Sequence, residues 1–60
     1  MTAQEFKDKF NAEPEYKKVI IRNKVIRELP CHYSSFYRKM NDLSWTATEL
    51  FFIEQCIWKN

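Results

Sequence analysis

The 60-residue sequence contains no glycine. Glycine is the residue that most often forms tight hairpin turns and the loops that wrap phosphate groups. Its absence therefore argues against β-hairpins and against nucleotide-binding loops. Only two prolines, Pro14 and Pro30, interrupt the chain. These features predict an all-helical protein.

A large charge of one sign and long apolar runs are also missing. Ten Lys and Arg against eight Asp and Glu give a net charge of +2, which is too small for bulk electrostatics to drive nucleic-acid binding. No run approaches the roughly 20 apolar residues that span a bilayer, and the first ten residues lack the apolar segment of a secretion signal. We therefore expect a cytoplasmic protein with no membrane partner. Its two cysteines, Cys31 and Cys56, are then reduced, and a disulfide between them is the less favoured alternative.

The apolar and aromatic content of the chain is typical of a folded domain. Apolar residues make up 45% of the chain and aromatic residues 17%, far from the low hydrophobicity of disordered sequences. A chain of this length forms one domain, residues 1–60, and buries only about 60% of the surface of its unfolded state. Stabilisation by a partner or by self-association is therefore expected.

Four short helices are predicted from local signals. Thr2 with Glu5, and Thr46 with Glu49, form capping-box patterns that start the first and last helices. Pro14 and Pro30 are expected in the first turns of the second and third, and Pro30 also ends the second. We predict a small bundle of three to four helices over about residues 3–10, 14–29, 31–40 and 46–58.

The predicted helix over residues 14–29 carries two apolar stripes. Tyr16, Val19, Ile20 and Ile26 fall on one side, and a second set at i, i+4 and i+8 falls nearly opposite. We predict that the Ile20 side is buried and that the second set binds another protein. The predicted core comprises Phe6, Phe10, Ile20, Tyr33, Phe36, Tyr37, Leu50 and Ile53, and the predicted partner-binding residues are Ile21, Val25 and Leu29, with Lys18 and Arg22 as a polar rim.

Two alternatives stay open for these apolar surfaces. In the first, both stripes pack inside the bundle and nothing is exposed. In the second, the last helix, which is apolar almost all round between Leu50 and Trp58, pairs with a second copy of the chain.

No catalytic or metal-binding arrangement emerges from the sequence. Cys31 and His32 are neighbours, and adjacent residues on a helix point about 100° apart, so they do not form a ready thiol-imidazole pair. Two cysteines and one histidine also lack the paired spacing of zinc sites. We expect no enzymatic activity, no metal and no cofactor.

Basic residues offer an alternative function. Five of them lie on the second predicted helix without an acid among them, but they scatter around its axis rather than lining one face. A small DNA-associated transcription or nucleoid regulator would use some of these together with two basic residues of the third helix, namely Lys17, Lys24, Arg27, Arg38 and Lys39.

The run IIRNKVIRELPCHYSSFYR, residues 20–38, resembles the theta subunit of bacterial DNA polymerase III and its phage-encoded homologue. That family has two apolar residues, then Val, then Arg-Glu-x-Pro-x-His, then Ser, two aromatics and Arg. The matching positions here are Ile20, Ile21, Val25, Arg27, Glu28, Pro30, His32, Ser35, Phe36, Tyr37 and Arg38, and FKDKFN, residues 6–11, is similar to a segment upstream in theta. The resemblance implies a small helical protein that binds and stabilises the proofreading exonuclease subunit.

A fainter likeness, in MTAQEFKDKF and VIIRNK, is to the small Hha-like nucleoid modulators, which are also helical and also bind another protein. Together these observations predict a non-enzymatic protein-binding module. It would be a small accessory subunit or a phage-type modulator of a host enzyme, such as a replication or proofreading subunit.

Overall fold

Four α-helices and one π-helical segment make up most of the computed structural model, which describes residues 1–29 and 31–58. The elements are α1 (Ala3–Ala12), α2 (Glu15–Glu28), α3 (Tyr33–Asp42), α4 (Ala47–Ile53) and the π-helical η1 (Glu54–Trp58), which continues α4. No strand occurs among the described residues. The predicted small all-α bundle is therefore confirmed.

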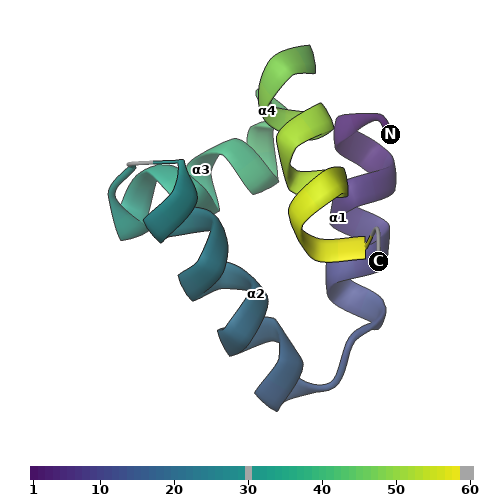
Figure 1. Cartoon of the computed structure of the whole chain (residues 1–60), viewed down its shortest axis with the longest axis vertical. Helices are drawn as coiled ribbons and strands as arrows, with labels where there is room; N and C mark the ends of the chain where they lie inside the picture. Colours follow the sequence, from purple (N-terminus) through teal and green to yellow (C-terminus); the bar gives the residue numbers. More distant parts are fainter. Residues whose placement is uncertain (30, 59–60) are drawn as a thin grey trace.

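The helices α1 and α2 diverge from the loop that joins them, like the arms of a V (Figure 1). α3 crosses at the far end of α2, and α4 with η1 returns toward α1. Contacts of α1 and of the preceding N-terminus with η1 fix this return, since the Phe6 and Trp58 rings lie 5.7 Å apart and the Met1 amino group is 2.7 Å from Glu54 Oε1. One side of α2 consequently faces the other helices, and the opposite side is free.

Both predicted capping boxes are present. Glu5 N donates to Thr2 Oγ1 at 3.1 Å, and Thr2 N donates back to Glu5 Oε1 at 2.7 Å. Thr46 and Glu49 repeat the exchange at 3.1 and 2.9 Å. Each box satisfies backbone donors that the first turn of a helix leaves free. The starts of α1 and α4 are thus set by residues three positions apart in the sequence.

The proline-related boundaries are partly wrong. Pro14 is the N-cap of α2, with φ −65° and ψ 160°, rather than part of the first turn. α1 extends to Ala12, past the predicted end at residue 10. α3 begins at Tyr33 instead of residue 31, with His32 as an extended N-cap. The predicted placement of Pro30 in the third helix lies outside the described residues.

Leucine occupies the backbone position at which many helices use glycine. Leu43, after the last residue of α3, has φ 55° and ψ 41°, in the left-handed region. This conformation brings Leu43 N and Ser44 N onto the Lys39 carbonyl, the latter at 3.1 Å, and so ends the helix. Because a side chain at positive φ crowds the following carbonyl group, this turn is strained relative to one with glycine.

Aromatic rings fill the centre of the bundle. Phe6 and Phe36 are fully buried, and both lie edge-to-face against Phe10 and Trp45 at centroid separations of 5.4 to 6.3 Å. Such geometry is favourable for ring pairs. The buried core is Phe6, Phe10, Ile21, Val25, Phe36, Met40, Trp45, Leu50 and Ile53. Five of the eight predicted core residues are confirmed, namely Phe6, Phe10, Phe36, Leu50 and Ile53.

The two stripes of α2 are the reverse of the prediction. Ile21 and Val25 are only 7% and 2% exposed and belong to the core, whereas Ile20 is 61% exposed and Tyr16 66%. A helix with neighbours on one side buries one arc, and here that arc is the i, i+4 series continued by the half-buried Leu29. Ile21, Val25 and Leu29 are therefore not an exposed partner-binding stripe.

Tyr33 and Tyr37 are also wrongly predicted as core, since both are exposed. Their hydroxyl groups need a hydrogen-bond partner or water, which the apolar centre of the bundle does not provide. They lie along α3 on the side of α2 and hydrogen-bond to Arg22. The aromatic stripe of α3 is thus divided between the core and the surface.

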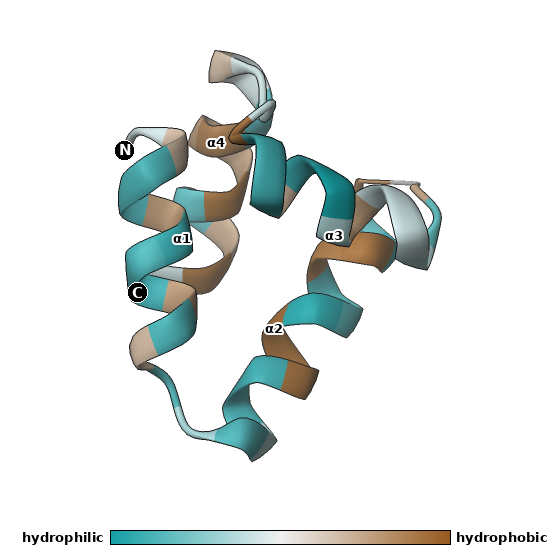
Figure 2. Cartoon of the chain, turned by 180° about the vertical axis from the view of Figure 1, so that it is seen from behind, coloured by the Kyte–Doolittle hydropathy of each residue, from teal (hydrophilic) through white to brown (hydrophobic). Residues whose placement is uncertain are grey.

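Most of the apolar surface of α4 and η1 is covered by the rest of the bundle. Leu50 and Ile53 are buried and most of the remaining apolar residues are half-buried, while Phe51 is 65% exposed. Figure 2 shows the hydrophobic residues of α2 interleaved with hydrophilic ones and α4 as largely hydrophobic. None of the described helices is both long enough and apolar enough to cross a bilayer.

The fold is compact without a partner. The Cα radius of gyration is 10.3 Å, close to the value of about 10 Å expected for a globular domain of this length. The exposed apolar side chains of α2 are thus a property of the folded bundle.

Candidate protein-binding surface

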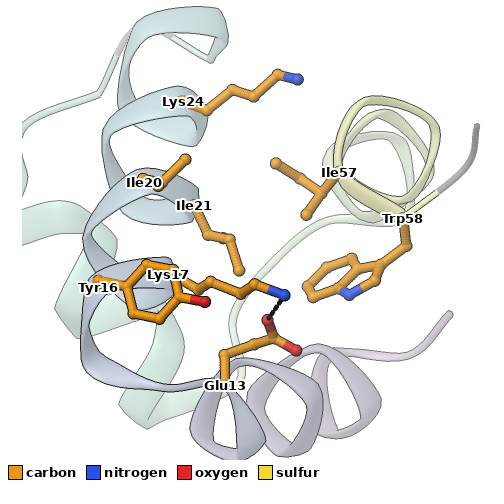
Figure 3. Close-up of a pocket in the computed structure, with 8 residues that line it drawn as sticks. All are labelled: Glu13, Tyr16, Lys17, Ile20, Ile21, Lys24, Ile57 and Trp58. Atoms are coloured by element: carbon orange, nitrogen blue, oxygen red, sulfur yellow. Dashed lines mark ion pairs between the residues drawn. The ribbon is translucent and has the colours of Figure 1, made fainter.

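An open groove runs between α2 and η1. We call it the α2–η1 groove. It has a volume of about 410 Å³, within the range of about 300–1,000 Å³ typical of ligand sites. Figure 3 shows Ile21 of α2 and Ile57 of η1 pointing toward each other across it, with Trp58 on the η1 side. The lining residues are Glu13, Tyr16, Lys17, Ile20, Ile21, Lys24, Ile57 and Trp58.

Basic side chains border this groove. Lys17 Nζ lies 4.0 Å from Glu13 Oε2, the separation of a weak ion pair, and its side chain is half exposed. Lys24 Nζ donates to the Cys56 carbonyl at 2.9 Å and so joins the second half of α2 to η1. Because a helix C-terminus carries partial negative charge, this contact stabilises the last turn. The groove therefore has an apolar floor, with two lysines and one acid, Glu13, at its edges.

The outer side of α2 continues the apolar surface. Tyr16, Val19 and Ile20, which we call the α2 face, are all exposed. Tyr16 and Ile20 also line the groove, so the two features form one surface. Contiguous apolar surface on a small protein is typical of a binding site, and tyrosine is enriched in protein interfaces.

A cluster of arginine and tyrosine borders the α2 face on the side of α3. Arg22 Nη1 donates to the Tyr33 hydroxyl at 2.8 Å and to the Tyr37 hydroxyl at 3.4 Å. The guanidinium carbon lies 4.5 Å from the centroid of the Tyr33 ring, which is cation–π distance. The hydrogen bond from Arg22 lowers the pKa of Tyr37. Arg22, Tyr33 and Tyr37 are called the Arg22 cluster below.

The structure separates the predicted partner-binding residues. Arg22 lies in the Arg22 cluster and Lys18 is half-buried. Leu29 packs against the core, as does Val25, while Ile21 reaches the groove only at its floor. The accessible apolar surface of α2 is therefore formed by the residues that were expected to be buried.

The predicted nucleic-acid-binding residues do not form one patch. Lys39 Nζ lies 2.6 Å from Glu49 Oε2 and 5.4 Å from the Trp45 ring, on the opposite face of α3 from its tyrosines. Lys24 is bound to a carbonyl and Lys17 lies near an acid, as described above. Arg27 Nε likewise lies 3.8 Å from Glu28 Oε1, and Arg38 is exposed.

Thiols and metal-ligand residues do not build a site in the described part of the chain. Cys31 and Cys56 are free and half-buried. No three side chains of the types His, Cys, Asp or Glu gather at metal-binding distance within residues 1–29 and 31–58. Cys31 and His32 instead border a shallow surface hollow with Ile26 and Arg27.

Comparisons with known proteins give no relative, because no model of a protein family, no curated protein and no solved structure matched the chain. The resemblance to the theta subunit stays a prediction.

Two parts of this surface, the α2–η1 groove and the Arg22 cluster, were not predicted from the sequence. The pairing of α2 with η1 depends on a contact between residues more than thirty positions apart, which periodicity does not report. The Arg22 cluster left a weak signal, because Tyr33 and Tyr37 are spaced i, i+4 and both carry hydroxyl groups that favour an accessible position.

Proposed function

We propose that this protein is a non-enzymatic module that binds another protein through the α2 face and the α2–η1 groove. The observation that carries the proposal is the continuous exposure of Tyr16, Val19 and Ile20 beside an apolar groove, on a chain that is already compactly folded. Leaving large apolar side chains in water is unfavourable, by about 25 cal/mol per Å² of apolar surface. A partner that covers this surface recovers that free energy.

The shape of the groove favours a helix as the occupant. Its walls are two helical segments, and an amphipathic helix can lay its apolar side between them. Two lysines, Lys17 and Lys24, against one acid, Glu13, give the groove lining a net positive charge, which favours a partner helix flanked by acidic residues. We therefore propose an acidic amphipathic helix of another protein as the occupant, with Ile57 and Trp58 contacting its apolar side.

The finer identity follows the sequence resemblance. We propose that the protein is an accessory subunit or phage-type modulator in the cytoplasm, where Cys31 and Cys56 stay reduced. The proofreading exonuclease subunit of a bacterial replicative polymerase is the first candidate partner.

Substitutions on exposed residues test this function without disturbing the core. The variant Tyr16→Ala/Ile20→Asp changes the α2 face, and Phe51→Asp is the matched control, because Phe51 is as exposed but lies on α4. Circular dichroism should show that both variants keep the helical fold. Each protein is then immobilised and exposed to the purified exonuclease subunit and, separately, to a bacterial lysate with quantitative mass spectrometry.

We expect wild type and Phe51→Asp to retain the same partner and Tyr16→Ala/Ile20→Asp to bind it at least about tenfold more weakly, the loss typical of central interface residues. Binding of the purified exonuclease subunit with this pattern would support the finer proposal. Equal retention of every partner by both variants would refute a role for the α2 face. Loss of binding only in Phe51→Asp would assign the interface to α4 instead.

A further inference from the structure

The Arg22 cluster is polar, and the proposed apolar contact with a partner helix does not use it. One nitrogen, Arg22 Nη1, donates to both the Tyr33 and Tyr37 hydroxyl oxygens, at 2.8 and 3.4 Å. A tyrosine hydroxyl that accepts a hydrogen bond still has its own hydrogen to donate, and this hydrogen rotates to suit an acceptor. The cluster therefore combines a positive charge with two neighbouring O–H donors at an exposed position.

The cluster is held in place by its surroundings. Arg22 Nε and Nη2 both donate to Asn23 Oδ1, at 3.3 and 3.1 Å, which orients the guanidinium plane. The Tyr33 and Tyr37 rings pack at a centroid separation of 5.3 Å, and the Tyr37 ring rests edge-on against the buried Phe36. The two hydroxyl groups are thus positioned by the core and by α2 before any ligand arrives.

The surroundings favour a negative oxygen. The hydrogen bond from Arg22 lowers the pKa of Tyr37, so this position stabilises the phenolate form. The charge of Glu15 opposes that shift. One cation with an acid close by suits a singly charged ligand better than a doubly charged one.

We infer that the Arg22 cluster is a binding site for a carboxylate, held by the Tyr33 and Tyr37 hydroxyl donors in front of the Arg22 guanidinium. This inference rests on the proposed function, since the cluster borders the α2 face and the carboxylate is an acidic side chain of the bound partner. Hydrogen bonds to charged groups are stronger than neutral ones. The site fixes how the partner lies across α2, in addition to the apolar contact.

Acetate is a suitable probe because it presents the carboxylate alone. In a ¹H–¹³C and ¹H–¹⁵N NMR titration of the whole chain, we expect saturable shifts of the Tyr33 and Tyr37 ring signals and of Arg22 Nε–H. Sodium chloride at equal ionic strength should not reproduce them. Inorganic phosphate, used above its second pKa as the doubly charged comparison, should bind more weakly than acetate at the same pH.

The variant Tyr33→Phe/Tyr37→Phe removes both donors and keeps the rings, so its affinity for acetate should fall by about tenfold. Ser34→Ala is the matched control, because Ser34 is a neighbouring exposed hydroxyl residue on the same helix, and its affinity should be unchanged.

Several results would overturn the inference. They are the absence of saturable shifts in wild type, equal shifts with chloride, tighter binding of phosphate, and unchanged affinity in the double variant. The titration needs no partner, so its failure is distinguishable from failure of the proposed function, which depends on Tyr16 and Ile20.

Discussion

Ile20 and Ile21 are adjacent on α2, and replacing each of them separately with alanine should affect stability very differently. Ile21 is 7% exposed and touches the core, whereas Ile20 is 61% exposed. Truncating a buried isoleucine to alanine costs about 2–5 kcal/mol, because apolar burial is lost and a cavity remains. We expect about 3 kcal/mol for Ile21→Ala, which is most of the stability that a 60-residue core supplies.

The cost at Ile20 can be worked out in the same way. About two fifths of this side chain is covered, and full burial of an isoleucine contributes about 1.5–3 kcal/mol, so truncation removes about 1 kcal/mol. Alanine returns about 0.4 kcal/mol through its higher helix propensity. The net loss for Ile20→Ala is therefore about 0.5 kcal/mol.

Thermal unfolding followed by circular dichroism at the helix band separates the two cases. In a domain of this size, 1 kcal/mol shifts the Tm by about 4–8 °C. Ile20→Ala should melt within about 4 °C of wild type and Ile21→Ala at least about 12 °C lower. Equal shifts, or a larger shift for Ile20→Ala, would refute the assignment of the two sides of α2.

Three further results are expected. Leu43→Gly should change the free energy of unfolding by less than about 1 kcal/mol in urea titrations, because relief of about 1–2 kcal/mol of strain at positive φ offsets the lost burial of a side chain that is 39% exposed; a loss of about 3 kcal/mol or more would show that the backbone at this turn is not strained. Burial alone would raise the pKa of Glu49, but the hydrogen bonds from Lys39 and from the cap at Thr46 lower it overall. The ionised Glu49 carboxylate therefore stabilises the fold above its unfolded-state pKa of about 4.5. This stabilisation is lost as the pH falls through the lower pKa of the folded state. Between pH 6 and pH 3, the free energy of unfolding of wild type should therefore fall by about 1 kcal/mol more than that of Glu49→Gln. Equal falls in the two proteins would show that Glu49 does not stabilise the fold in its ionised form. In fluorescence anisotropy, duplex DNA should bind weakly and non-specifically at physiological salt, because Lys39 is paired with Glu49 and Lys24 with the Cys56 carbonyl; tight binding with a steep salt dependence would favour the alternative function.

Local signals in the sequence predicted the helices well. A capping box depends on residues three positions apart, and Thr2 and Thr46 start their helices as expected. The all-α class followed from the lack of glycine and from the apolar periodicity. The turn at Leu43 was not foreseen in detail, because only the folded backbone shows that a leucine takes the left-handed conformation.

Which side of α2 faces inward could not be decided from periodicity. Both stripes have helical spacing, and their hydrophobicity is similar. The choice depends on α1, α3 and η1, which pack against the Ile21 side in the fold. A clue was available in Tyr16, whose hydroxyl group favours the surface, and the same clue applies to Tyr33 and Tyr37. An exposed apolar surface was therefore predicted on α2, but the exposed side is the other one.

The orientation of α2 can be measured directly in solution. A soluble gadolinium chelate increases the relaxation of methyl protons according to their exposure, and Ile53, at 1% exposed, provides an internal buried reference. We expect strong relaxation of the Ile20 methyl groups and weak relaxation of those of Ile21 and Val25, close to the Ile53 value. Strong relaxation at Ile21 and Val25 with protection of Ile20 would contradict the account.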